Sequence, residues 1–161
     1  MGFTRYWRFK KKANKKEREK VIEAMSSIIG LEKERLTGYD GEEETPIEIK
    51  KTCVSFNGIG EDSHETFCFI PGTKPDETNF CKTRNKPYDR AVCACLIAAK
   101  RILGEKIEVD SDGPGDEDLL ALNMVDEILG PEPEEVKPKP KPKLTKFGKA
   151  ILPLVEGGRK K

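Results

Sequence analysis

The chain has 161 residues and a formal net charge of +1, and its hydrophobic fraction of 35% is slightly below its charged fraction of 37%. That length suffices for one ordinary domain with a single core, and no apolar run approaches the roughly 18 residues of a membrane-spanning helix. A lysine cluster stands where a secretory signal would have its apolar stretch, so we expect a cytoplasmic protein.

The charge is distributed unevenly along the chain. Residues 1–20 carry nine Lys and Arg against two Glu, and residues 131–161 carry nine against four. Taking these +7 and +5 from the total of +1 leaves −11 for residues 21–130. Basic ends on an acidic body favour self-association or contacts with anionic partners over uniform coating of nucleic acid, and solvated ends without a partner are the simpler alternative.

The N-terminal third predicts a strand and a helix. Residues 3–9 alternate between large and polar side chains, which is typical of a strand. After Asn14 the period changes to that of a helix, which Gly30 is expected to end. One face of this helix is apolar and comprises Val21, Ile22, Met25, Ile28 and Ile29.

The middle of the chain predicts a hairpin followed by a long loop. Residues 47–56 form a strand with an irregularity at Lys50-Lys51, where the alternation changes parity. Residues 64–70 follow as its partner, across a turn at residues 57–60. Residues 71–86 are rich in turn-forming residues and are expected to be a loop.

The remainder predicts two helices around a short strand. An apolar stripe runs from Tyr88 to Ile102 behind Pro87, a residue that suits an early helical position. Residues 106–110 alternate as a strand, and residues 116–129 form a further helix. Residues 132–143 are Pro/Lys/Glu low complexity and cannot bury a core.

The order β-α-β-β-α-β, followed by a helix, is that of a ferredoxin-like sandwich. We therefore predict an α+β fold of this topology, with one domain over residues 1–130 and a largely disordered linker and basic tail over residues 131–161. In this topology, strand 64–70 lies beside strand 3–9 in the middle of the sheet.

This topology places His64 and the segment Lys82–Asp89 at opposite ends of the sheet, because a seven-residue strand spans roughly 20 Å. The second end gathers cations beside a helix N-terminus, where unpaired N–H groups suit a phosphate or carboxylate. We expect a small anionic, phosphorylated ligand there, or a host protein; solvated loop charges are the simpler alternative. The expected binding residues, which lie near Thr4 and Arg84, are Arg5, Lys82, Thr83, Lys86, Asp89, Ser111 and Asp112.

The main alternative function is a hydrolase or transferase that uses His64 with Glu65 or Asp89 in acid–base roles. No metal or cofactor is expected, because His64 and Cys68 in one strand lie about 13 Å apart, too far to share an ion. The five cysteines form no Cys-x-x-Cys pair and are expected to be free thiols.

Two further partner classes are not expected. Residues 66–69 lack the glycines and the basic start of an RNA-recognition strand, and the body is acidic, which argues against nucleic acid. The apolar residues of segment 144–155 are interrupted by Gly148 and Pro153, which weakens a helix that could contact a membrane. A virion-associated protein remains a third class of function.

Several short blocks resemble an uncharacterised family of small proteins from tailed bacteriophages. These blocks cover about residues 2–113 and comprise Gly2-Phe3-Thr4-Arg5-Tyr6-Trp7, Asp62-Ser63-His64-Glu65-Thr66-Phe67, Phe80-Cys81-Lys82-Thr83, Lys86-Pro87-Tyr88-Asp89, Val92-Cys93-Ala94 and Ser111-Asp112-Gly113. The resemblance implies a phage accessory protein in the host bacterial cytoplasm, acting against host machinery or defence, and brings no established activity. Family members tend to carry His where Arg5 stands, a change that is compatible with anion binding but not with proton transfer.

Overall fold

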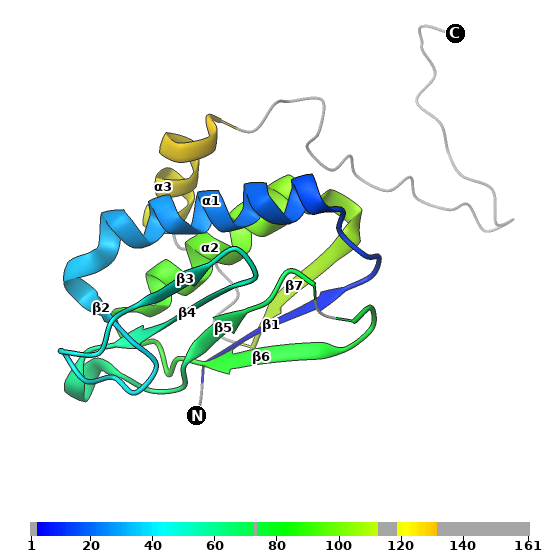
Figure 1. The fold of residues 1–161 in the computed structure, drawn as a ribbon. Helices are drawn as coiled ribbons and strands as arrows, with labels where there is room; N and C mark the ends of the chain where they lie inside the picture. The colour runs from blue at the N-terminus through cyan, green and yellow to red at the C-terminus, as the bar shows by residue number, and fades with distance from the viewer. Residues whose placement is uncertain (1–2, 73, 113–118, 132–161) are drawn as a thin grey trace, which may run out of the picture.

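The computed structural model describes residues 3–72, 74–112 and 119–131. In this part of the chain, α1 and α2 lie on one side of two antiparallel sheets, and α3 packs against both helices (Figure 1). The strands and helices are β1 (Thr4–Phe9), α1 (Lys15–Glu32), β2 (Leu36–Thr37), β3 (Glu48–Lys50), β4 (Cys53–Gly58), β5 (Phe67–Phe69), β6 (Thr78–Lys82), α2 (Asp89–Leu103), β7 (Ile107–Ser111) and α3 (Leu119–Leu129).

The predicted α+β class is confirmed, and so is the helix that follows the last strand. The part of that helix predicted over residues 116–118, and the tail predicted over residues 132–161, lie outside the described residues. The first sheet has the order β6-β1-β7, and in the second β4 pairs with β2, β3 and β5.

Helix α1 begins as predicted and ends later than predicted. The Asn14 side chain accepts a hydrogen bond from the Glu17 backbone N–H at 2.8 Å, and the Glu17 carboxylate accepts one from the Asn14 N–H at 2.9 Å. This capping box fixes the first turn. The helix then continues through Gly30, because burial of Ile28 and Ile29 offsets the roughly 1 kcal/mol that a helical glycine costs.

The expected irregular strand over residues 47–56 is a hairpin. Strand β3 pairs antiparallel with β4, with Lys50 opposite Cys53, so the chain reverses over Lys51 and Thr52. The change of parity at Lys50-Lys51 therefore marked a turn. Sequence analysis did not predict it, because lysine and threonine are not typical turn residues. The pairing of β4 with β5 confirms the predicted hairpin, although β5 is limited to Phe67–Phe69.

The ferredoxin-like strand order is corrected by β6, which lies inside the predicted loop 71–86. Strand β6 pairs antiparallel with β1, with Lys82 opposite Thr4 and Phe80 opposite Tyr6. It takes the place beside β1 that the ferredoxin-like order gives to strand 64–70. Sequence analysis did not recognise the strand pattern of β6, because its large apolar side chain, Phe80, is 60% exposed and points away from the core.

Buried aromatic rings join the two sheets. The Trp7 ring lies 5.3 Å from the Phe67 ring and 5.9 Å from the Phe69 ring, measured between centroids. Phe9 also contacts Phe69, at 5.8 Å, and Phe56 contacts Phe67, at 5.1 Å. Because these rings come from β1, β4 and β5, they hold the three-stranded sheet against the four-stranded one.

Replacing Phe69 by Ala is expected to lower the free energy of unfolding by about 3–5 kcal/mol, because it leaves a cavity between the sheets. Phe80→Ala is the matched control, since it deletes the same side chain at an exposed position, and should cost less than about 1 kcal/mol. Urea denaturation of both variants measures the difference. Equal losses would contradict the assignment of Phe69 to the core.

Candidate functional site

The segments 61–65 and 82–89 lie side by side, so the predicted separation of His64 from Lys82–Asp89 is wrong. The Glu65 carboxylate accepts a hydrogen bond from the Lys82 N–H at 2.7 Å, and the Glu65 N–H donates to the Lys82 carbonyl at 3.2 Å. The Lys86 ammonium donates to the Glu61 carbonyl at 2.9 Å. Strand β6 explains the error, because it returns the chain to the end of the molecule that it left through β5.

Tyr88, at the start of α2, anchors the segment that carries His64. Its hydroxyl donates a 2.6 Å hydrogen bond to the Glu65 carbonyl, which also accepts one from the Cys81 thiol at 3.4 Å. The Tyr88 ring is fully buried, and burial raises the pKa of its hydroxyl. Gly58 permits this packing, because a Cβ there would lie 2.1 Å from the Asp62 carbonyl oxygen and 2.9 Å from the Tyr88 ring.

The backbone of His64 is held by the side chain of Asn57. The Asn57 amide donates to the His64 carbonyl at 2.9 Å and accepts from the His64 N–H at 3.1 Å. Asn57 itself is buried, whereas His64 is exposed. Its imidazole is therefore displayed on the surface from a fixed backbone.

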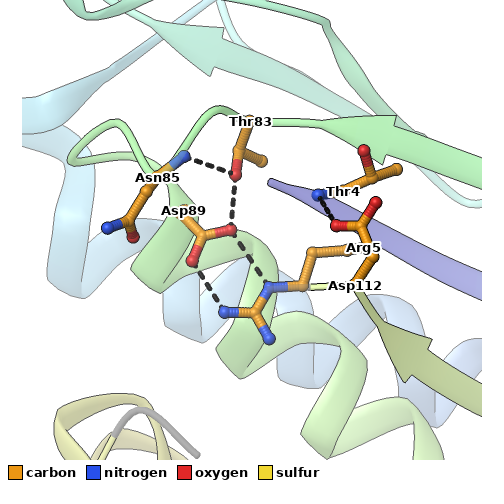
Figure 2. Close-up of polar contacts among 6 residues, drawn as sticks. All are labelled: Thr4, Arg5, Thr83, Asn85, Asp89 and Asp112. Atoms are coloured by element: carbon orange, nitrogen blue, oxygen red, sulfur yellow. Dashed lines mark hydrogen bonds and ion pairs between the residues drawn. The ribbon is translucent and has the colours of Figure 1, made fainter. Parts of the chain in front are cut away.

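A buried ion pair forms the centre of the predicted binding site (Figure 2). The Arg5 guanidinium binds the Asp89 carboxylate with two hydrogen bonds, at 3.0 and 2.7 Å. The Thr83 hydroxyl donates a third to the same carboxylate, at 2.7 Å. The Arg5 and Asp89 side chains are only 11% and 6% exposed, so water screens this network poorly.

The network fixes the turn that leads into α2. Thr83 and Arg84 donate their N–H groups to the Phe3 carbonyl, at 2.9 and 3.1 Å, and the Asn85 N–H donates to the Thr83 hydroxyl at 3.3 Å. Arg84 and Asn85 have φ angles of +53° and +57°. Left-handed backbone at a non-glycine residue costs on the order of 1 kcal/mol or more and persists where surrounding contacts enforce it.

The end of β7 borders this site. Asp112 accepts a hydrogen bond from the Thr4 N–H at 2.6 Å and one from the Tyr6 hydroxyl at 3.3 Å, and Ser111 lies opposite Arg5 in the sheet.

The structure therefore brings the seven expected binding residues together, with unequal access to solvent. Arg5, Thr83 and Asp89 are buried, Lys82, Lys86 and Ser111 are half-buried, and Asp112 is exposed. The buried Arg5 is paired with Asp89, so its charge is already balanced within the protein.

Sequence analysis missed the supporting roles of Tyr88, Asn57 and Phe3. Tyr88 was assigned to the core for its ring, and its buried hydroxyl was the available signal, because such a group needs a hydrogen-bond partner. Phe3 contributes its carbonyl and a ring that lies 4.8 Å from the Arg5 guanidinium carbon. The partners of Asn57 and of the Phe3 carbonyl depend on the path of the chain, and no residue pattern shows them.

The cysteines near the site are poorly suited to nucleophilic chemistry. All five are free thiols. Burial raises the pKa of Cys81 from 9.0 to about 12, and burial also raises that of Cys95. Both therefore stay protonated at neutral pH, while the nucleophile is the thiolate. Among the residues that the structure describes, no group of His, Cys, Asp and Glu is arranged to hold a metal ion.

Comparisons of the chain with protein-family models, with curated proteins and with solved structures give no match. Within the described ranges, none of the helices combines the length and apolar character needed to cross a membrane.

We expect Asp89→Ala to destabilise the fold by about 3–5 kcal/mol, because it leaves the Arg5 charge buried without its carboxylate. Glu108→Ala is the control, since it breaks the Arg8–Glu108 pair, whose side chains are 38% and 55% exposed, and should cost less than about 1 kcal/mol. Chemical denaturation measures both. A small loss for Asp89→Ala would show that the network does not hold the turn.

Thiol labelling tests the environment of Cys81. In native protein at pH 9.0, the usual pKa of a thiol, iodoacetamide should modify the exposed Cys68 and leave Cys81 and Cys95 unmodified until the protein is unfolded. Peptide mass spectrometry identifies the modified positions. Rapid modification of Cys81 in the native state would contradict this environment and would make Cys81 a candidate nucleophile.

Proposed function

We propose that the protein is a non-enzymatic binding module that holds an anionic group, such as the phosphate of a small ligand, on the turn formed by residues 82–86. The observation that carries the proposal is the pair of successive left-handed residues, Arg84 and Asn85. The buried Thr83 hydroxyl holds them in place, because it accepts a hydrogen bond from the Asn85 N–H and donates one to Asp89. Strained backbone of this kind concentrates at functional sites.

The charges of the turn suit an anion. Lys82, Arg84 and Lys86 surround the start of α2, and the N-terminus of a helix favours negative charge. Lys86 is oriented by its bond to the Glu61 carbonyl, so part of the entropy cost of binding is already met.

Arg5 acts in this proposal as a supporting residue. It balances the charge of Asp89, which would otherwise repel an anion at the helix N-terminus. The ligand would then contact Lys82, Arg84 and Lys86, while Arg5, Thr83 and Asp89 hold the turn. The exposed carboxylate of Asp112 would repel an anion, so the binding site would not extend to the end of β7.

A host protein is the second candidate partner, because large aromatic side chains are exposed near the turn. Phe80 is 60% exposed and precedes Lys82 by two residues in β6, so both side chains lie on one face. Tyr39 is 67% exposed, and its carbonyl accepts a hydrogen bond from Asn57, which also holds His64. Exposed aromatic anchors beside charged groups are common in protein interfaces.

The enzymatic alternative has less geometric support. The carboxylate of Glu65 is bonded to the Lys82 N–H, and that of Asp89 is bonded to Arg5 and Thr83. Both acids proposed as partners of His64 therefore have structural roles. The resemblance to small phage proteins supports placing this binding activity in the bacterial cytoplasm, where an accessory protein would meet its host ligand or partner.

Titration of ¹⁵N-labelled protein with pyrophosphate tests the anion site. Amide shifts should concentrate in residues 82–90, and Arg84→Gln with Lys86→Gln should weaken binding by roughly tenfold or more, because each change removes a charge-assisted hydrogen bond. Lys50→Gln with Lys51→Gln is the charge-matched control, at the β3–β4 turn. Equal weakening by both pairs, or no shifts at millimolar pyrophosphate, would contradict the site.

Native mass spectrometry of protein purified from infected cells distinguishes the two partners of the proposal. A retained phosphorylated molecule supports the small-ligand form, and a bound host protein supports the second candidate. Protein that carries neither would count against both.

A further inference from the structure

The three-stranded sheet β6-β1-β7 has an open outer face. The helices α1 and α2 lie on its other side (Figure 1), where Trp7 and Phe9 of β1 are buried. Successive side chains of a strand point to opposite faces, so Tyr6 and Arg8 belong to the outer face. Both are half-buried. Within the described ranges, no helix is placed over this face.

One row of side chains crosses the outer face. Phe80 of β6 and Asp110 of β7 both lie opposite Tyr6 of β1, on its two sides. Neighbouring strands are about 4.8 Å apart, so the row spans roughly 10 Å. Phe80 is 60% exposed, and Asp110 is also exposed. The row therefore presents two aromatic rings followed by a carboxylate.

The two rings of this row are held against each other. Their centroids lie 6.5 Å apart, and the ring planes are tilted by 46°. The Tyr6 hydroxyl donates a hydrogen bond to the Asp112 carboxylate at 3.3 Å, which restrains the ring. Most of the Phe80 side chain is accessible to solvent, so a partner that covers it gains apolar contact.

The charges of the outer face favour a cation. Three carboxylates of β7, those of Glu108, Asp110 and Asp112, stand against the two cations Arg8 and Lys82, which leaves −1. Lys82 lies in β6, two strands away from the carboxylates. At the far margin of the face, the exposed charges of residues 74–77 and of Lys10 include two Lys and two acids, so they cancel.

Asp110 is the carboxylate of this face that has room for a ligand. Glu108 is already bound to Arg8, and Asp112 is bound to the Thr4 N–H and the Tyr6 hydroxyl. Among the residues that the structure describes, Asp110 has no cation within 4.0 Å, and it accepts only the N–H of the next residue, at 2.8 Å.

A neighbouring row shows how a guanidinium fits between β1 and β7. Arg8 lies opposite Glu108 in the sheet, just as Tyr6 lies opposite Asp110. The Arg8 guanidinium donates two hydrogen bonds to the Glu108 carboxylate, at 3.2 and 2.7 Å. In the row of Tyr6 the carboxylate is present and the guanidinium is missing, with an aromatic ring in its place.

We propose that the row of Phe80, Tyr6 and Asp110 binds an arginine side chain from a segment of the host protein partner. The guanidinium lies over the Tyr6 ring and against Phe80, and Asp110 accepts its hydrogen bonds. Arginine suits this row better than lysine, because its planar group stacks on aromatic rings and binds a carboxylate with two donors. This contact rests on the host-protein candidate of the proposed function and is independent of the anion site.

Two other occupants fit the outer face less well. The three carboxylates of β7 repel the phosphates of a nucleic acid. A second copy of the chain needs about 800 Å² on each partner for a stable interface. Three short strands offer a flat area of only a few hundred Å², roughly 10 Å wide between the outer strands and about 17 Å long. That area suits a short peptide segment.

Fluorescence anisotropy with a labelled peptide in which arginine alternates with serine tests the proposal in the full-length protein. Phe80→Ala should weaken binding about threefold or more, because it removes one ring from the cation. Asp110→Asn should weaken it about tenfold, because it removes the charge of the acceptor while keeping an oxygen for the Ser111 N–H. The same peptide with lysine in place of arginine should bind several-fold more weakly.

The matched controls lie on α1, at the opposite side of the sheet. Leu31→Ala removes an apolar side chain that is 49% exposed, and Glu23→Gln removes one exposed negative charge. Both should leave the affinity for the arginine peptide unchanged. Thermal unfolding of each variant checks that the fold is retained.

Several results would overturn the proposal. These are no saturable binding of the arginine peptide, equal binding of the lysine peptide, and equal losses in the controls. Binding of a labelled single-stranded oligonucleotide that Phe80→Ala abolishes, or a dimer in sedimentation that the same change dissociates, would assign the row to another occupant. The amide shifts caused by pyrophosphate should persist in Phe80→Ala and Asp110→Asn, so a failure of this row is distinguishable from a failure of the anion site.

Discussion

The structure of the candidate site depends on the buried ion pair between Arg5 and Asp89. Desolvating two charges is costly, and here two direct hydrogen bonds and a third from Thr83 compensate for that cost. The pair links the first strand of the chain to the first turn of α2, which lies 84 residues later. The Thr83 hydroxyl extends the link to the turn, so the turn cannot relax without disturbing the ion pair.

Sequence patterns predicted the helices and strands in which buried apolar side chains recur at a regular spacing. The helices α1 and α2 and strand β1 show a regular apolar face, and the structure buries those faces. Strand β6 was missed because its alternation places Phe80 outside and the small Cys81 inside, which reverses the usual signal. The β3–β4 turn was missed because neither Lys51 nor Thr52 favours a turn.

Sequence analysis placed the expected site residues at one end of the molecule, as the structure does, although the strand order that it assumed was wrong. Arg5 and Asp89 meet because β1 and the start of α2 lie at the same end in both arrangements. The position of His64 depends on how often the chain crosses the molecule between residues 64 and 82, and the added strand β6 changes that number by one. Between His64 and residues 82–89 only β6 is added, so these segments come to the same end. Between Arg5 and Asp89 both the β3–β4 turn and β6 add a crossing, and the two additions together leave Arg5 and Asp89 at one end.

Strand β1 connects the candidate site with a lysine-rich loop at the other end of the molecule. Its first residues belong to a hydrogen-bonded site, where Arg5 is matched by Asp89 and the 82–86 turn carries the exposed Arg84 and the half-buried Lys82 and Lys86. Its last residue leads into the loop, which begins with three successive lysines at residues 10–12. A separation of about 17 Å is roughly two Debye lengths at physiological salt, so the charges of the loop and those of the candidate site influence each other little.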